Sequence, residues 1–265
     1  MTQTRPPHAL TVSRPDRAEV ARVATAELAA WAALLADLAA EDWRRPTASG
    51  WTVREMIAHV VGQQAESARP WTIGGKIRRA RRRYPAMSSL DAHNALQVAE
   101  YGTLTPAELT RTLATLGVNA VRSRRRTPGL VRRQSALRYF PEEPLIEPRL
   151  GYVIDVLSNR DTWMHRVEIA RATGRAFLAG EHDKAVVAQV VLDLALEWAG
   201  PAIELELSGA LGGTWGLGRG KPIATVRVET LDYLWLLSGR VGRPALDIDG
   251  DREVAGPVLD ARVVF

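Results

Sequence analysis

The sequence contains no cysteine. This absence excludes disulfide bonds, zinc–thiolate sites and a cysteine nucleophile, so any thiol chemistry must use the thiol of a small molecule. The chain also lacks an apolar run of the roughly 18 residues that a membrane-spanning helix needs. Its most apolar stretch, residues 185–199, is interrupted by Asp193 and Glu197. No long apolar block follows the N-terminus, so we expect no secretory signal and a cytoplasmic location.

The overall composition is ordinary for a folded protein. The 265 residues are 46% hydrophobic and 25% charged, which are values typical of globular chains. The length fits one large domain or two ordinary ones. The formal net charge of +5 permits an anionic ligand but does not require one.

Two arginine-rich segments, residues 76–83 and 122–133, carry much of the positive charge. Surfaces that bind single-stranded nucleic acid usually interleave aromatic side chains with basic ones. Here Tyr84 is the only aromatic residue directly beside the first segment. We therefore interpret both segments as solvated basic loops, and a nucleic-acid-associated protein stays an alternative. No membrane partner is expected, because no aromatic face lies opposite the arginines.

The first two thirds of the chain are dominated by helical patterns. Capping residues, proline positions and apolar periodicity predict five long helices. Residues 1–13 are expected to be a frayed tail, and residues 71–87 and 127–148 are expected to be connectors. The predicted helices span about residues 17–40, 52–68, 89–101, 105–126 and 150–173.

The pattern changes after residue 178. Residues 183–199 are still helical, but Ile203–Leu207 alternate with a period of two, and strands are predicted at 214–217 and 223–229. A short helix at 231–237 ends at Gly239. We therefore predict an α+β protein with an N-terminal helical bundle, residues 1–178, and a small mixed α+β domain, residues 179–265.

His59 lies at the edge of the apolar stripe of the second predicted helix, with Gln63 and Glu66 near it. A lone histidine in this position is usually a half-buried, hydrogen-bonded residue at the border of the core. Taken by itself, His59 therefore favours a structural role.

The predicted helix at 150–173 carries the stronger signal. Asp161, His165 and Glu168 occupy one face, which also carries apolar residues, so these polar groups point toward the interior. Burying them costs several kcal/mol unless a partner compensates. A divalent metal is one such partner, and one carboxylate with two histidines is the ligand set of a catalytic zinc. The alternative is an ordinary buried salt bridge, and the metal site requires His59 to join from its own helix.

Several segments resemble a known family. Residues 50–60, GWTVREMIAHV, are similar to the GWTVRD-x-x-AH signature of the DinB-like, mycothiol-dependent maleylpyruvate isomerases. Residues 160–170 resemble the second metal-binding segment of that family, and residues 91–96 resemble its D-x-x-N helix. Residues 237–240 and 250–251 are similar to parts of its sterol-carrier-like C-terminal domain.

This resemblance implies a bundle of about four helices and a divalent metal, usually zinc, held by His59, Asp161 and His165. The family carboxylate is often glutamate, so Asp161 is one methylene shorter. The family often has aspartate where Glu168 stands, so Glu168 is expected to support a ligand rather than to bind metal. Imidazole and carboxylate also suit iron and nickel.

The resemblance also implies an activity. Mycothiol would bind the metal as a thiolate and attack a small electrophilic or acidic substrate, either to isomerise it or to form a thioether. The alternative within the same fold is a catalytically inactive protein that binds a small molecule.

Two further residues are candidates for binding the thiol cofactor or the substrate. Arg240 is either a catalytic and cofactor-binding clamp for an anion or a surface arginine near a helix C-terminus. Asn94 is either a cofactor contact or part of a polar network.

Overall fold

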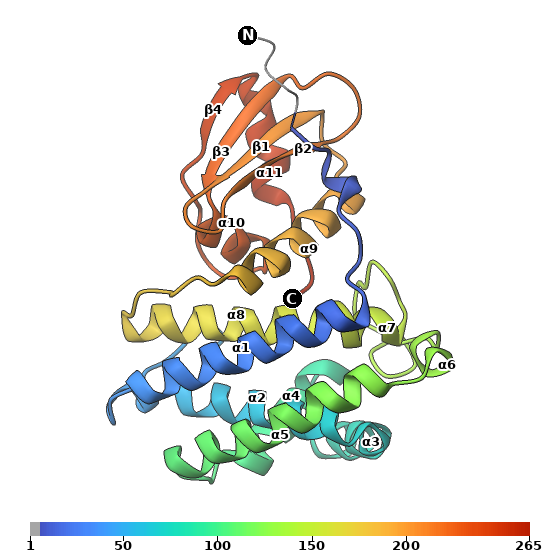
Figure 1. Ribbon diagram of the computed structural model, residues 1–265, viewed down its shortest axis with the longest axis vertical. Coiled ribbons are helices and arrows are strands. Elements are labelled where there is room, and N and C mark those ends of the chain that lie inside the picture. The colour runs from blue at the N-terminus through green and yellow to red at the C-terminus, as the bar shows by residue number, and fades with distance from the viewer. Residues whose placement is uncertain (1–5) are drawn as a thin grey trace. The chain divides into compact units, whose positions relative to one another are not determined.

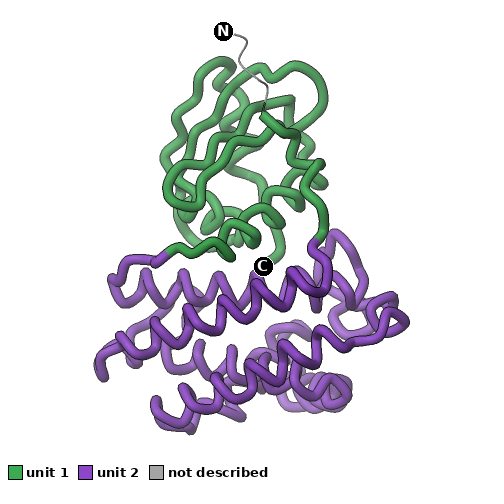
Figure 2. The backbone as a smooth tube through the Cα atoms, in the orientation of Figure 1, with its two compact units in different colours: residues 1–14, 179–265 green, residues 15–178 purple. Residues whose placement is uncertain are grey.

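A computed structural model describes residues 6–265 of the chain. The chain divides into two compact units (Figure 2). One unit consists of residues 15–178, and the other consists of residues 179–265 together with the segment before residue 15. No helix among the described residues is long and apolar enough to cross a membrane.

The unit of residues 15–178 is a bundle of helices (Figure 1). Helix α2 packs against α4, α5 and α8, and α1 packs against α5 and α8. The helices of this unit are α1 (Arg17–Asp37), α2 (Val53–Ala68), α3 (Ile73–Arg83), α4 (Ser89–Tyr101), α5 (Pro106–Arg126), α6 (Gly129–Arg132), α7 (Leu150–Tyr152) and α8 (Ser158–Thr173).

Local sequence signals determine where the long helices begin and end. The Thr52 hydroxyl accepts the Glu55 backbone N–H while the Glu55 carboxylate accepts the Thr52 N–H, which forms a capping box at the start of α2. Thr105 and Glu108 do the same for α5. Gly174 ends α8 in a left-handed conformation with φ of +69°.

Two expectations for this unit are wrong. The segment 71–87 is not an irregular connector, because residues 73–83 form α3. Ile77 and Ala80, three residues apart, are buried on the face of α3 toward α4, while arginine is a good helix former at the exposed positions. The helix predicted at 150–173 is not uniform either, because a π-helical stretch, Val153–Leu157, separates α7 from α8.

The core of the bundle surrounds α2. Every residue from Met56 to Gly62 is buried. The other large buried side chains of this cluster come from α1, α5, α8 and the loop before α2, and they include Trp31, Trp43, Leu109, Leu113 and Ile169. A polar side chain on this part of α2, such as His59, is therefore placed in the interior of the bundle.

The second unit contains a four-stranded mixed sheet in the order β2-β1-β3-β4. Strands β1 and β3 are parallel, and the outer pairs are antiparallel. The α+β fold class is therefore confirmed, although β4 had no clear signal in the sequence. The elements are α9 (Glu181–Glu197), β1 (Ile203–Ser208), β2 (Gly213–Leu217), β3 (Ala224–Glu229), α10 (Thr230–Leu237), β4 (Asp247–Gly250) and α11 (Ala255–Asp260).

The described part of the N-terminal segment is ordered, which corrects the expected frayed tail. His8 forms a bridge with Gly216 on β2, and its Nε2 donates to the Gly218 carbonyl at 2.8 Å. Ala9, in a short 3-10 helix, is fully buried. The segment thus satisfies backbone groups at the edge of the sheet, a long-range pairing that local sequence does not reveal.

Candidate metal centre

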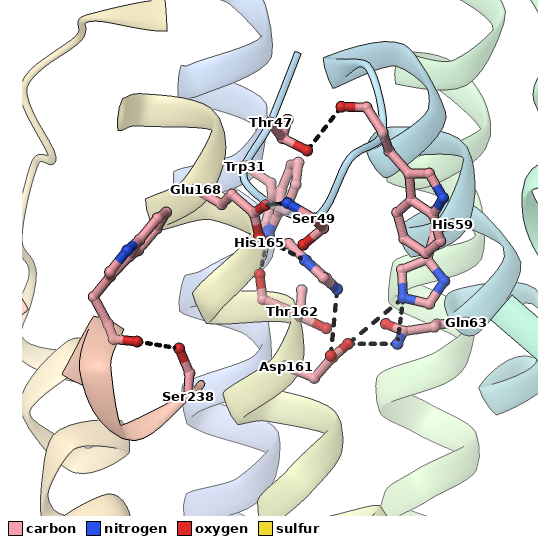
Figure 3. A network of polar contacts seen from close by, with 12 residues as sticks. Trp31, Thr47, Ser49, His59, Gln63, Asp161, Thr162, His165, Glu168 and Ser238 are labelled. Atoms are coloured by element: carbon pink, nitrogen blue, oxygen red, sulfur yellow. Dashed lines mark hydrogen bonds and ion pairs between the residues drawn. The ribbon is translucent and has the colours of Figure 1, made fainter. Parts of the chain in front are cut away.

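Three side chains predicted from the sequence converge inside the helical bundle. His59 comes from α2, and Asp161 and His165 come from α8 (Figure 3). His165 Nε2 lies 3.3 Å from Asp161 Oδ1, and His59 Nε2 lies 3.8 Å from Asp161 Oδ2. One ligand atom from each residue lies within 4.8 Å of the others, so the group could hold a metal ion. We call these three residues the triad.

The loop before α2 sets the position of His59. Thr47 donates its backbone N–H and its hydroxyl to the Trp51 carbonyl at 2.7 and 2.8 Å, which closes a tight turn around Gly50. Gly50 has a φ of +81°, a conformation that favours glycine. The Trp51 ring then packs against the His59 imidazole, with centroids 5.1 Å apart. Residues 50–60, which resemble the family signature, therefore supply His59 and also the Trp51 ring that packs against it.

The separations within the triad fit a divalent cation. Nitrogen and oxygen ligands about 2.0–2.1 Å from a tetrahedral zinc lie about 3.3 Å apart. The His165–Asp161 separation equals this value, and the His59–Asp161 separation is slightly longer. The two histidines are almost fully buried, while the Asp161 side chain is 24% exposed. The donors are thus largely shielded from solvent, and Asp161 is the most exposed of the three.

The electrostatics of the triad also suit a cation. Burial lowers the pKa of His59, against the opposing effect of the nearby Asp161 carboxylate. The ring is therefore neutral at neutral pH, and one of its nitrogens has a lone pair that can bind a cation. Burial by itself raises the pKa of Asp161, but His165 and His59 outweigh burial and hold that pKa well below its usual range. Asp161 is therefore ionised across the physiological range.

Glu168 lies behind His165 rather than among the converging atoms. Its Oε2 is 3.7 Å from His165 Nδ1, on the side of the ring away from Asp161. Its Oε1 accepts the Ser49 backbone N–H at 2.6 Å (Figure 3). The carboxylate is thus within ion-pair range of the His165 ring, and its hydrogen bond to Ser49 ties the loop before α2 to α8.

A buried polar network extends from the triad along α2. Glu66 accepts a hydrogen bond from Gln97 Nε2 at 2.8 Å and lies 2.9 Å from His93 Nε2. Lys76 Nζ lies 3.4 Å from Glu66 Oε1. The Gln97 side chain acts to raise the pKa of His59, against the larger lowering effect of burial, which links the network to the triad electrostatically.

Two buried atoms of this network need partners. In the part of the chain that the structure describes, neither His59 Nδ1 nor Gln97 Oε1 has a hydrogen bond. Ligand histidines usually donate their second N–H to an acceptor, and Gln97 Oε1 is a candidate for that role. The sequence did not identify Gln97 or His93. His93 and Gln97 are four residues apart on α4, so the sequence places them on one face of that helix. This spacing does not show which neighbouring helix that face contacts.

Two further candidates were predicted from the sequence, Arg240 and Asn94. Arg240 follows α10 in the second unit, and its guanidinium lies 5.5 Å from the Trp235 ring. Asn94 is half-buried on α4, and no hydrogen bond joins it to the triad among the described residues. Roles for both in binding cofactor or substrate stay predictions.

The fold and the site define a helical-bundle protein with a candidate metal centre, followed by a small α+β unit. Residues 24–170, more than half of the chain, match the family model of the mycothiol maleylpyruvate isomerase N-terminal domain. The chain therefore belongs to this family, which confirms the resemblance seen in the sequence. The matched range contains all three residues of the triad.

Solved structures agree with this assignment at the level of the fold. The crystal structure of a mycothiol-dependent maleylpyruvate isomerase aligns with a TM-score of 0.57 at 15% identity, covering 89% of this chain and 95% of that chain. A variant of such an isomerase with a histidine replaced by alanine gives the same score and identity, covering 88% and 93%. No curated protein matches the chain significantly.

Proposed function

We propose that this protein is a metal-dependent enzyme that uses mycothiol to isomerise a small electrophilic substrate or to form a thioether conjugate with it. The convergence of His59, Asp161 and His165 from two helices is the observation that carries the proposal. Family membership supports the choice of thiol, because the similar solved structures are named for their dependence on mycothiol.

The ligand set supports a catalytic rather than a structural metal. Three protein ligands leave one position of a tetrahedral metal open for a reactant, and zinc is the metal we favour. A divalent metal held by the triad would supply the positive charge that deprotonates a thiol near neutral pH, which makes the sulfur nucleophilic. Because the chain has no cysteine, that thiol must come from outside.

The residues around the triad have separate tasks in this proposal. Glu168 orients His165, and Trp51 packs against His59 and keeps water from that side of the ring. Asp161, the most exposed member, faces the side from which reactants enter. Arg240 is proposed as a clamp for a carboxylate of substrate or cofactor. A cytoplasmic location stays a prediction.

The test is an activity assay with matched variants. Zinc-loaded protein is mixed with mycothiol and either maleylpyruvate or an activated aryl chloride, so that isomerisation and thioether formation with release of chloride are measured separately. We expect one of the two reactions to depend on both zinc and mycothiol and to be lost in His165→Ala. A protein that binds zinc and mycothiol but converts neither substrate would instead favour the inactive binding protein.

A further inference from the structure

Gln63 lies between two members of the triad. It follows His59 by one turn on α2, and its side-chain Nε2 lies 3.0 Å from His59 Nε2 and 2.5 Å from Asp161 Oδ2 (Figure 3). These are the same two atoms whose separation fits a metal ion. The amide of Gln63 therefore borders the space on which the donors converge.

This arrangement cannot persist once a cation is bound. The amide N–H groups donate to the lone pairs that a metal would use, and they carry partial positive charge. A half-turn about the last side-chain bond exchanges the amide nitrogen with the oxygen, and the two groups have nearly the same shape. After this rotation the carbonyl oxygen faces the cation. The side chain is half-buried, and the rotation moves only its terminal amide, so it needs no change in the helix.

The positions along the helices support a ligand role for this oxygen. His59 and Gln63 are four residues apart on α2, and Asp161 and His165 are four residues apart on α8. Helical bundles build metal sites from inward side chains at this spacing on facing helices. The two pairs together supply four donors. The capping box at Thr52 fixes the start of α2, the helix that carries His59 and Gln63.

We propose that Gln63 Oε1 is a fourth protein ligand, which fills the open position of the metal until a thiol displaces it. This inference rests on the proposed metal site of the triad. A neutral amide oxygen is a weaker ligand for zinc than a thiolate, so exchange would favour the thiol. The site would thus be closed to water at rest and open to its cofactor.

Cobalt(II) provides the readout, because its visible absorption reports the ligands without any need for turnover. Four versions of the full chain are loaded with cobalt: wild type, Gln63→Leu, Gln63→Glu and Gln64→Leu. Gln64 is the neighbouring buried glutamine on α2, so its variant controls for removing an amide from this helix. Circular dichroism and thermal unfolding confirm that each variant is folded.

The pH dependence of the cobalt spectrum separates a protein ligand from solvent. Water on such a metal ionises at about pH 7, so a site with bound water changes its spectrum near neutral pH. We expect wild type and Gln64→Leu to show no such change while cobalt stays bound. Gln63→Leu should show it and bind zinc about tenfold more weakly. Gln63→Glu, which keeps an oxygen donor, should again show no change.

A thiol titration gives a second, independent readout. Mercaptoethanol should produce a sulfur-to-cobalt absorption band in both wild type and Gln63→Leu, at a lower thiol concentration in the variant because no amide needs to be displaced. A neutral-pH transition in wild type, or identical spectra and affinities for wild type and Gln63→Leu, would overturn the role of Gln63 while leaving the triad intact. A wild-type protein that takes up no cobalt would overturn both proposals.

Discussion

Asp161 and His165 lie one turn apart on α8, with the carboxylate oxygen 3.3 Å from the imidazole Nε2. The two side chains share the inner face of a helix whose residues from Thr162 to Ala170 are all buried. Burying an ionised carboxylate without a partner costs free energy. Here His165 and His59 compensate for the burial of Asp161. The pair therefore provides a permanent negative charge beside two nitrogen donors.

Replacing Asp161 by asparagine tests that charge directly. Asp161→Asn keeps the size of the side chain but removes the anionic donor, so we expect zinc affinity to fall by about 100-fold or more. Competition with a chromophoric chelator measures the change. Asp155→Asn is the matched control, because Asp155 is in the adjoining π-helical stretch and pairs with Arg132 instead. Equal losses in both variants would contradict a specific role for Asp161.

Glu168→Gln tests the support behind His165. The substitution weakens the contact with His165 Nδ1 and replaces the charged acceptor of the Ser49 N–H with a neutral one. We expect zinc affinity to fall by about 10–100-fold and the free energy of unfolding of the metal-free protein to fall by about 1–3 kcal/mol. Chelator competition and urea titration measure the two effects. If zinc affinity is unchanged but stability falls, Glu168 stabilises the fold and does not support the metal site.

Substitution of Gly62 by alanine tests how closely α2 packs against α4. A Cβ atom at this position would lie 2.6 Å from Gln97 Cβ and 3.3 Å from the Gln97 Cα. Alanine in a helix normally gains about 1 kcal/mol over glycine, but we expect Gly62→Ala to destabilise the protein by about 1–3 kcal/mol because α4 must shift.

Gly75 in α3 is the matched position for this experiment. Nothing lies within 4 Å of its Cβ position, and the residue is exposed. Gly75→Ala should therefore stabilise the protein by up to about 1 kcal/mol in urea unfolding. Stabilisation by both substitutions would show that the helices have room to separate at Gly62.

Glu66 gives the protein a predictable dependence on acid. Burial by itself raises the pKa of Glu66, but His93 and Lys76 outweigh burial and lower that pKa below its usual 4.5. Because the pKa is lower in the folded state, ionised Glu66 stabilises the fold above pH 4.5. This contribution is lost as the pH falls from there through the folded pKa.

The matching experiment compares Glu66→Gln with wild type in urea at several pH values, with metal removed. We expect the variant to be less stable by about 1–3 kcal/mol around neutral pH and the difference to shrink below pH 4.5. Glu100→Gln is the control, because Glu100 binds Lys76 at the more exposed end of the network. A difference that stays constant with pH would mean that the charge of Glu66 does not matter.

The sequence predicted the features that depend on short-range signals. Capping residues located α2 and α5, and the four-residue spacing of Asp161 and His165 placed both on one helix face. The approach of His59 to this pair depends on how α2 packs against α8, which helical periodicity does not show. The family resemblance supplied that link.

Features that depend on tertiary contacts were missed for the same reason. The sequence of helix α3 resembles a basic connector because only Ile77 and Ala80 form its buried face. The edge strand β4 is short and mostly exposed, so it lacks an alternating pattern. Gln63 was seen to lie near His59, but its position between His59 and Asp161 requires both helices.

The most direct test of the account is the metal content of the protein after purification without chelators. We predict about one zinc or similar divalent ion per wild-type chain, and loss of that ion in His59→Ala and in His165→Ala when both variants remain folded. Absence of metal from wild type, even after zinc is added, would contradict the account. The triad would then be a set of polar residues in the core, and the protein would be a binding protein without metal chemistry.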